Sequence, residues 1–405
     1  MYKRQLIHSL TLVATSVSEW SIEARIAIGS RLGSGLRAAR VAEPLPAPAE
    51  RAAVPLPRTT RPEVGPCRFA AFALFFIATA CAQSPLVIAH RGASGYLPEH
   101  TLAAKAYAHA LGADYIEQDL VLTKDDVPVV LHDIYLDTVS DVAQKFPDRK
   151  RADGRYYALD LTLAELKQLR VRERFNAKTG KAVFAKRYPS AAAPSALQIS
   201  TLEEELQLIQ GLNASTGRVA GIYPEIKQPK WHREQGHDIS KVVLPILVRH
   251  GYATKADACY LQCFELNEVR RLRAELGWRG KLIQLIETKA MGEDGTDHDA
   301  LCTPAGIAEL AKIVDGIGPA IGRIVTWPVA GGAPKFTSLV ALAHAQKLAV
   351  HPYTVRVDEL PKNCPGADAL HAAIFRELRA DGVFTDFTDV TAGWVKRNAA
   401  PQGRP

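Results

Sequence analysis

Two short stretches of the sequence place carboxylates inside otherwise apolar, strand-like patterns. One is IEQDL, with Glu117 and Asp119, and the other is YPEIK, with Glu225 and Lys227. Residues two apart in a strand point to the same face, so Glu117 and Asp119 lie about 7 Å apart on one side. Taken singly, each pair could line a solvated sheet face. In a strand covered by helices, such charges must face the interior and need a partner, and a divalent cation is the simplest one.

The residue types indicate which ion and which substrate this site would take. All-oxygen ligation by Glu117, Asp119 and Glu225 selects a hard cation, Ca²⁺ or Mg²⁺, over zinc. Three carboxylates and one such cation would repel a further anion unless Arg91 and Lys227 also face the site. An arginine fork matches two phosphate oxygens. We therefore expect a metal and cationic residues around a phosphate group.

Two histidines end strand-like runs, His90 in LVIAH and His132 in PVVLH. A single histidine at such a position is more often structural. If the two strands are neighbours in a parallel (β/α)8 barrel, however, both histidines lie at the carboxyl-end face, where such barrels carry their active sites. Cleavage of a phosphodiester needs a base for the nucleophile and an acid for the leaving alcohol. Two imidazoles that titrate near neutrality can supply both, so the pattern predicts an acid–base pair.

Apolar runs alternate with amphipathic stretches from residue 86 onward. We expect strands at 86–90, 115–123, 128–132, 221–227, 259–264, 281–287, 323–327, 348–354 and 382–387. We expect helices at 101–112, 200–212, 238–251, 265–277, 303–314, 338–348 and 369–382. About eight βα units predict an α/β fold, a (β/α)8 TIM barrel; a doubly wound sheet is the alternative, but HRGASG lacks the spacing of a dinucleotide-binding loop. The polar segment 141–199 predicts a small inserted subdomain after the second-strand region.

The start of the chain has the composition of a leader. Residues 1–64 lack periodicity and predict disorder or a mis-called start, with a genuine Arg/Ser-rich extension as the alternative. Residues 65–83 place arginines before about twelve apolar residues, the layout of a secretory signal. Cys81 follows IATA, so both lipidation of Cys81 and simple cleavage near Ala82 stay open. We expect a bacterial periplasmic or secreted protein. The remaining predicted segments are a catalytic domain at 84–398 and a tail at 399–405.

The distribution of charge bears on the class of binding partner, and the spacing of the cysteines bears on possible disulfides. The formal net charge is +7, but residues 1–80 hold ten Lys or Arg and five Asp or Glu, so most of it lies in the leader. The nearly neutral remainder has no basic run that would indicate a nucleic-acid partner. Cys259 and Cys263 are too far apart in a strand to form a disulfide and are expected in the core. Cys302 and Cys364 could pair or remain free thiols.

The quoted residues resemble the signature region of the glycerophosphodiester phosphodiesterases. The stretch from AHRGASG to VVLHD carries the likeness, and YPEIKQPKWHREQGHDI, YLQCFELNEVRRLR, VHPYTVR and GVFTDFTD resemble later blocks of the periplasmic branch. The resemblance runs from about Leu86 to Trp394. It implies that His90 and His132 are the acid–base pair, that Glu117, Asp119 and Glu225 bind a metal, commonly Ca²⁺, and that Arg91 and Lys227 contact phosphate.

The expected reaction is hydrolysis of glycerophosphodiesters, such as glycerophosphocholine, to sn-glycerol 3-phosphate and an alcohol. Trp231 would wall the glycerol pocket or serve packing, while Gln262 and Tyr353 would lie near the site. We expect a small-molecule substrate, contact with a membrane only through an anchor at Cys81, and a monomer or homodimer.

Two alternatives compete with this reading. A lysophospholipase D or sphingomyelinase D-like enzyme would favour an exposed apolar rim, whereas 141–199 is polar. A non-catalytic binding protein on the same barrel would be expected to lack one of the histidines or carboxylates of the site, and all five are present.

Overall fold

The computed structural model describes residues 84–184, 187–188 and 195–398. The predictions for 1–83, which include the signal segment and Cys81, and for the tail at 399–405 lie outside these described residues. Within them, no helix is long and apolar enough to cross a membrane.

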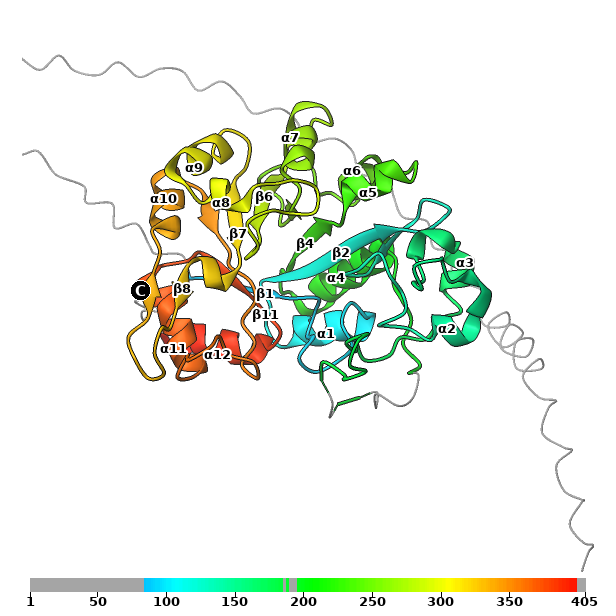
Figure 1. The fold of residues 1–405 in the computed structure, drawn as a ribbon, viewed down its shortest axis with the longest axis horizontal. Coiled ribbons are helices and arrows are strands. Elements are labelled where there is room, and N and C mark those ends of the chain that lie inside the picture. The colour runs from blue at the N-terminus through cyan, green and yellow to red at the C-terminus, as the bar shows by residue number, and fades with distance from the viewer. Residues whose placement is uncertain (1–83, 185–186, 189–194, 399–405) are drawn as a thin grey trace, which may run out of the picture. The chain divides into compact units, whose positions relative to one another are not determined.

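Eight parallel strands form the predicted (β/α)8 barrel (Figure 1). In chain order they are β1 (Leu86–Ala89), β2 (Tyr115–Leu122), β4 (Gly221–Ile226), β5 (Tyr260–Cys263), β6 (Lys281–Ile286), β7 (Gly316–Pro319), β10 (Ala349–Val350) and β11 (Gly382–Thr385). They pair in the order β10-β7-β6-β5-β4-β2-β1-β11. Backbone hydrogen bonds of 3.0 Å, from Asp381 N to the Val350 carbonyl and from Phe384 N to the Pro352 carbonyl, connect the last strand to β10.

Helices surround the strands. The outer ones are α1 (Leu102–Ala110), α4 (Leu202–Thr216), α6 (Ile239–Arg249), α7 (Leu266–Ala274), α9 (Pro304–Leu310), α10 (Leu339–Ala345), α11 (Ala367–Ala372) with η5 (Ala373–Glu377), and α12 (Thr388–Asn398). Local signals set their ends. Thr201 and Glu204 form a capping box at the start of α4, and Gly217, with φ 70°, ends this helix in the left-handed conformation. Short helices α5 (Pro229–Glu234), α8 (His298–Leu301) and η4 (Ile321–Arg323) lie in the connections.

Two strand predictions need correction. Residues 128–132 do contain a strand, β3 (Pro128–Val130), but it pairs antiparallel with β2, so His132 does not follow a barrel strand. Residues 323–327 contain only β8 (Val325–Thr326), paired with β9 (Lys335–Phe336) outside the barrel. The sixth barrel strand is instead the Gly- and Pro-containing β7. A Cβ at Gly316 would lie 2.6 Å from the Ala349 carbonyl oxygen, so close strand packing explains a residue type that weakens the strand signal.

A second apolar core is formed mainly by the chain segment between β3 and α4, which we call the inserted region. It contains the short elements α2 (Val142–Lys145), η2 (Pro147–Arg149), η3 (Ala158–Asp160) and α3 (Leu163–Leu166). Its buried side chains include Leu136, Leu161 and Leu169, together with Leu131 and Ile134, which precede position 141. This inserted region packs beside β2 and α1 in Figure 1, at the edge of the barrel.

The barrel interior has an apolar layer beneath the polar residues. Ile88, Tyr223, Ile283 and Phe384 form one buried cluster contributed by four different strands. Because side chains two residues apart share a face, the next inward positions are His90 after Ile88, Glu225 after Tyr223, and Asp386 after Phe384. These three polar side chains therefore form the layer next to the apolar cluster, on the side of the strands' carboxyl ends.

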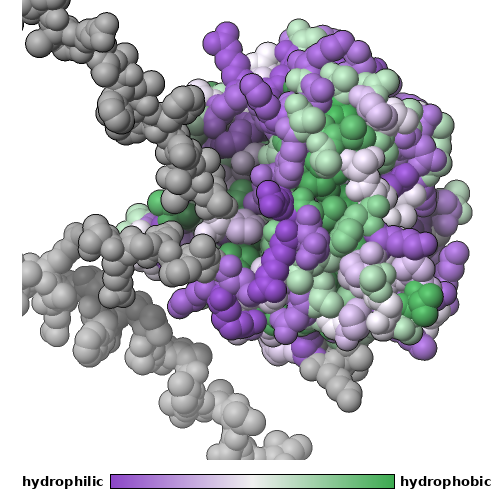
Figure 2. All heavy atoms as spheres, turned by 90° about the vertical axis from the view of Figure 1, so that its left-hand side faces the viewer, coloured by the Kyte–Doolittle hydropathy of each residue, from purple (hydrophilic) through white to green (hydrophobic). Residues whose placement is uncertain are grey.

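The outside of the barrel mixes polar and apolar side chains. Figure 2 shows the face that lies on the left of Figure 1, where apolar residues are exposed between hydrophilic ones. Val329 and Phe336, on the β8–β9 hairpin, are among the exposed large apolar residues. Scattered exposure of this kind is ordinary for a folded protein.

Candidate active site

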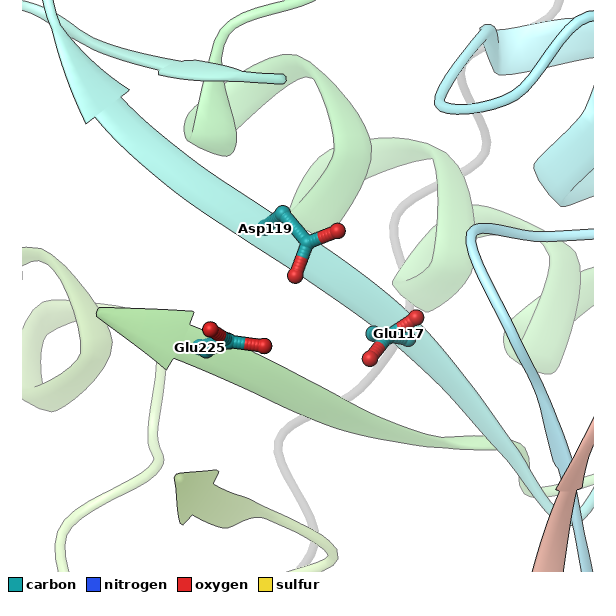
Figure 3. Close-up of side chains that lie close together, drawn as sticks. All are labelled: Glu117, Asp119 and Glu225. Atoms are coloured by element: carbon teal, nitrogen blue, oxygen red, sulfur yellow. The ribbon is translucent and has the colours of Figure 1, made fainter. Parts of the chain in front are cut away.

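Three carboxylates meet inside the barrel mouth. Glu117 and Asp119 project from β2 and Glu225 from β4, and their side chains point toward one another (Figure 3). One oxygen of each lies within 4.8 Å of the others, and all three residues are buried. The register explains the meeting, because Asp119 is paired directly with Glu225 across the two parallel strands.

The donor set fits a hard divalent cation. Oxygens within 4.8 Å of each other can share an ion at the 2.3–2.6 Å distances usual for calcium. The buried Asp119 Oδ1 has no hydrogen-bond partner among the described residues and is free to ligate. Burial and the neighbouring carboxylates raise the pKa of Glu117 and Glu225 above the usual range. A cation would relieve this like-charge crowding.

Each carboxylate is also held by a protein group. Gln262 Nε2 donates to Glu117 Oε1 at 3.0 Å, and the backbone N–H of Arg91 donates to Glu117 Oε2 at 2.8 Å. His100 Nε2 lies 2.7 Å from Asp119 Oδ2, and Lys227 Nζ lies 2.7 Å from Glu225 Oε1. Despite burial, Lys227 and His100 hold the pKa of Asp119 well below its ordinary value. The cluster is therefore fixed in place before any ion or substrate binds.

The turn after β1 explains the HRG sequence. Arg91 has φ 57° and Gly92 has φ 85°, both in the left-handed region. A Cβ at Gly92 would lie 2.9 Å from the backbone carbon of Ala104 at the start of α1, so only glycine fits this close approach. The turn aims the Arg91 N–H at Glu117 and leaves its guanidinium 3.7 Å from Asp119.

The two histidines are each oriented by a carboxylate. His90 Nδ1 lies 2.5 Å from Asp386 Oδ1, and His132 Nδ1 lies 2.6 Å from Asp133 Oδ1, which leaves both Nε2 atoms free for chemistry. Burial lowers the pKa of His90, but the carboxylates of Glu117 and Asp386 outweigh it and raise the net value. Burial and the charges of Arg91 and Lys227 lower the pKa of His132 to about 4.

Two adjoining cavities open at the barrel mouth. The inner cavity, of about 230 Å³, is lined by His90, Arg91 and the three carboxylates, together with His132. The outer cavity, of about 440 Å³, includes Lys227 in its lining. The residues that line both cavities are His132, Glu225, Phe264 and Tyr353.

The structure brings together nine of the ten predicted site residues. The exception is Trp231 on α5, which stacks on Tyr157 of the inserted region at a centroid distance of 5.5 Å and lines neither cavity. This contact corresponds to the packing role that the sequence left open. Gln262 holds Glu117, and Tyr353 stands at the boundary of the cavities with its hydroxyl donating to the Ile286 carbonyl at 3.2 Å.

Several supporting residues were missed from the sequence. Asp386 lies 296 positions from His90. Arg174 of the inserted region contacts Asp133 at 2.5 Å and Glu99 at 2.7 Å, and Glu99 in turn contacts Arg91 at 3.0 Å. His298, which stands in no sequence pattern that indicates a site, lines the outer cavity. Of these, only Asp386 carried a sequence signal, because it directly follows the strand-like GVFT.

The predicted thiol positions are also described. Cys259 and Cys263 are buried, as expected, and Cys302 and Cys364 are free rather than paired.

A parallel barrel with paired histidines and clustered carboxylates at its carboxyl-end mouth defines a hydrolase of phosphoric diesters. A family model described as the glycerophosphoryl diester phosphodiesterase family matches residues 90–390. The chain belongs to this family, and its reaction is the hydrolysis of glycerophosphodiesters to glycerol 3-phosphate and an alcohol.

Individual relatives agree. The chain is 43% identical over 330 residues to a glycerophosphodiester phosphodiesterase of Haemophilus influenzae. The aligned region covers 77% of this chain and 90% of that protein. It is 36% identical over 337 residues to one of Treponema pallidum, covering 79% and 94%. Among solved structures, an Oleispira antarctica phosphodiesterase in complex with the product sn-glycerol-3-phosphate matches with a TM-score of 0.52 and 20% identity, covering 77% of this chain and 97% of that one. This last similarity concerns the fold.

Proposed function

We propose that the enzyme cleaves glycerophosphodiesters with His90 and His132 as its proton-transfer pair and a calcium ion between Glu117, Asp119 and Glu225. The observation that carries this proposal is the position of the two carboxylate-anchored imidazoles beside three buried carboxylate oxygens within 4.8 Å of one another. When bound, the ion would polarise a phosphoryl oxygen and stabilise transition-state charge. Calcium is favoured over magnesium because it tolerates an irregular carboxylate site.

Arg91 and Lys227 receive the phosphate. Both are buried cations beside the carboxylates, and they line the inner and outer cavity respectively. Arg91 is anchored by Glu99 at 3.0 Å and Lys227 by Glu225 at 2.7 Å, so both charges are positioned before the substrate arrives. A phosphodiester anion between them would gain charge-assisted hydrogen bonds from each.

The positions of the histidines support separate roles for them in the proposal. His90 lines only the inner cavity and is paired with Asp386, an arrangement suited to a base that takes a proton from the nucleophile, whether water or the glycerol 2-hydroxyl. His132 lines both cavities and is suited to protonate an alcohol leaving toward the outer one. Burial, together with the charges of Arg91 and Lys227, keeps the pKa of His132 low; a bound phosphate anion would offset both charges, so substrate binding favours the protonated acid.

The cellular setting is part of the proposal. The apolar segment at 65–83 and the polar, small-molecule substrate support export to the periplasm or secretion, with Cys81 as a lipid-anchor candidate. A monomer or a homodimer is part of the same proposal. Mass spectrometry of the exported protein tests the anchor: an acylated N-terminal Cys81 supports it, and an unmodified N-terminus near Ala82 contradicts it.

The experiment that tests the residue roles measures glycerol 3-phosphate release from glycerophosphocholine. His90→Ala and His132→Ala should each lower kcat by roughly 10²–10⁴-fold, the range of general acid–base catalysis. His344→Ala changes a half-buried histidine on α10 that pairs with Asp381, outside both cavities, and as the matched control it should retain full activity. Wild-type rates in either active-site variant would refute the assignment. Lysophosphatidylcholine assayed in parallel distinguishes a lysophospholipase D, which would prefer it.

A further inference from the structure

The outer cavity has a charge that the hydrolysis of a phosphodiester does not require. Besides the metal candidate Glu225 and Asp133, which pairs with Arg174, four carboxylates line it: Glu265, Glu287, Glu293 and Asp294. In the described part of the chain, none of them has an ion-pair partner within 4.0 Å. The lining also contains Lys227, which pairs with Glu225, and Lys289, so an excess of negative charge remains. These four carboxylates, which we call the acidic wall, face a substrate whose phosphodiester is itself an anion.

The acidic wall belongs to the fold of the mouth. Glu265 follows the end of β5, and Glu287 directly follows β6, the neighbouring barrel strand. Thr296 joins the loop after β6 to α7, because its hydroxyl accepts the Leu266 N–H at 3.0 Å and donates to Asp294 Oδ2 at 2.6 Å. Burial and the nearby charge of Asp294 raise the pKa of Glu265 to about 7. Carboxylates are thus held close together by well-formed local structure.

A buried imidazole supplies a second, independent observation. His298, the first residue of α8, is only 1% exposed and lines this outer cavity. Its Nδ1 has no hydrogen-bond partner among the described residues. A buried polar atom without a partner is costly, so a ligand that supplies one is favoured. Phe264, whose ring meets His298 edge-on at 6.4 Å, and Tyr353 add aromatic faces, which also attract cations.

We propose that the outer cavity is a subsite for a positively charged amino-alcohol headgroup, which leaves when the phosphodiester is cleaved. This inference rests on the proposed function, because it places the phosphate at Arg91 and Lys227 and the leaving alcohol beside His132. An ammonium group would neutralise part of the acidic wall, and the N–H of an ethanolamine headgroup, which choline lacks, would offer a donor to His298. A neutral headgroup gains less there, and an anionic one is repelled.

The test compares kcat/KM for glycerophosphoethanolamine and glycerophosphocholine, which are cationic at the headgroup, with that for the neutral glycerophosphoglycerol. The wild type should prefer the cationic substrates. At pH 8, above the pKa of about 7 of Glu265, Glu287→Gln and separately Glu265→Gln should lower the ratio of cationic to neutral kcat/KM about tenfold, because each removes one charge near the headgroup. Glu309→Gln, an exposed carboxylate on α9 that pairs with Lys312, removes the same charge elsewhere and should leave the ratio unchanged.

The outcomes separate the two proposals. An unchanged ratio in both glutamine variants, or a wild type that prefers glycerophosphoglycerol, overturns the headgroup subsite while hydrolysis itself stands. Failure of the wild type to cleave all three substrates overturns the proposed function instead. Glu265 and Glu287 follow different strands, so if one variant misfolds, the other still tests the headgroup subsite.

Discussion

At the scale of single residues, the site separates its two imidazoles by their surroundings. His90 pairs with Asp386 near the further carboxylate of Glu117, whereas His132 lies near the cations Arg91 and Lys227. Opposite electrostatic surroundings move the two pKa values apart, so in the free protein His90 binds a proton more readily than His132. The proposed roles therefore follow from the cavities that each imidazole lines, and the phosphate of a bound substrate would offset the two cations that, together with burial, lower the pKa of His132.

An activated leaving group tests these roles. A p-nitrophenyl glycerophosphodiester releases an alcohol that leaves without protonation, so loss of the general acid should matter little. We expect His132→Ala to lose roughly 10³-fold on glycerophosphocholine but only about tenfold on the p-nitrophenyl ester. His90→Ala should lose heavily on both substrates. Steady-state kcat for the four combinations gives the answer, and equal losses for His132→Ala on both substrates would reverse or reject the assignment.

Sequence reasoning found the residues that would touch substrate or metal but missed most of those that orient them. His90, Glu117 and Glu225 stand in short motifs whose charges are out of place in apolar strands. Glu99 and Arg174 lie in polar segments where charged residues are ordinary, and their ion pair forms only when distant segments meet in the fold.

At the scale of elements, the two-residue period of the strands positions the chemistry. It predicted that Glu117 and Asp119 share a face, and the parallel register of β2 and β4 brings Glu225 beside Asp119. The period could not predict the direction of β3, because a three-residue apolar strand looks alike in parallel and antiparallel pairing. The period also did not predict β7, because glycine has a low strand propensity. Gly316 is instead required by the close packing of β7 against β10.

Helix α1 stabilises the site strand through a buried lysine. Lys105 is fully buried, and its Nζ lies 3.1 Å from both Glu205 Oε2 on α4 and His100 Nδ1, while it also donates to the Glu117 carbonyl. His100 carries this network on to Asp119 at 2.7 Å. One cation thus connects two helices and β2.

Lys105→Met should therefore destabilise the fold. It leaves the Glu205 carboxylate buried without its cation, which typically costs about 3–5 kcal/mol. Urea unfolding followed by circular dichroism measures the free energy of unfolding. As a control, Lys312→Met removes an exposed lysine and should change it by less than about 0.5 kcal/mol. A loss below about 1 kcal/mol for Lys105→Met would contradict the structural role assigned to the lysine.

At the scale of the whole molecule, the inserted region is tied to the chemistry by one arginine. Arg174 holds Asp133, which orients His132, and Glu99, which anchors Arg91. The barrel and the insertion therefore meet in a single ion-pair network. Composition and periodicity indicated both parts of the catalytic domain, whereas this link depends on three-dimensional packing.

Arg174→Met tests the link. It should lower kcat/KM for glycerophosphocholine about 10- to 100-fold, because both Asp133 and Glu99 lose their shared partner while the catalytic residues stay in place. Arg155→Met is the matched control within the insertion, where Arg155 pairs only with Asp137 at 2.9 Å among the described ion pairs. Equal activity of the two variants would show that the insertion does not position the site.

The central claim is that a divalent cation held by Glu117, Asp119 and Glu225 is needed for hydrolysis. The most direct measurement is glycerol 3-phosphate release from glycerophosphocholine by protein stripped with EDTA and then titrated with Ca²⁺. The account predicts that stripping abolishes activity, that Ca²⁺ restores it in the wild type, and that Asp119→Asn is not restored at the same concentration. Activity that survives chelation, or an Asp119→Asn variant restored like the wild type, would contradict it.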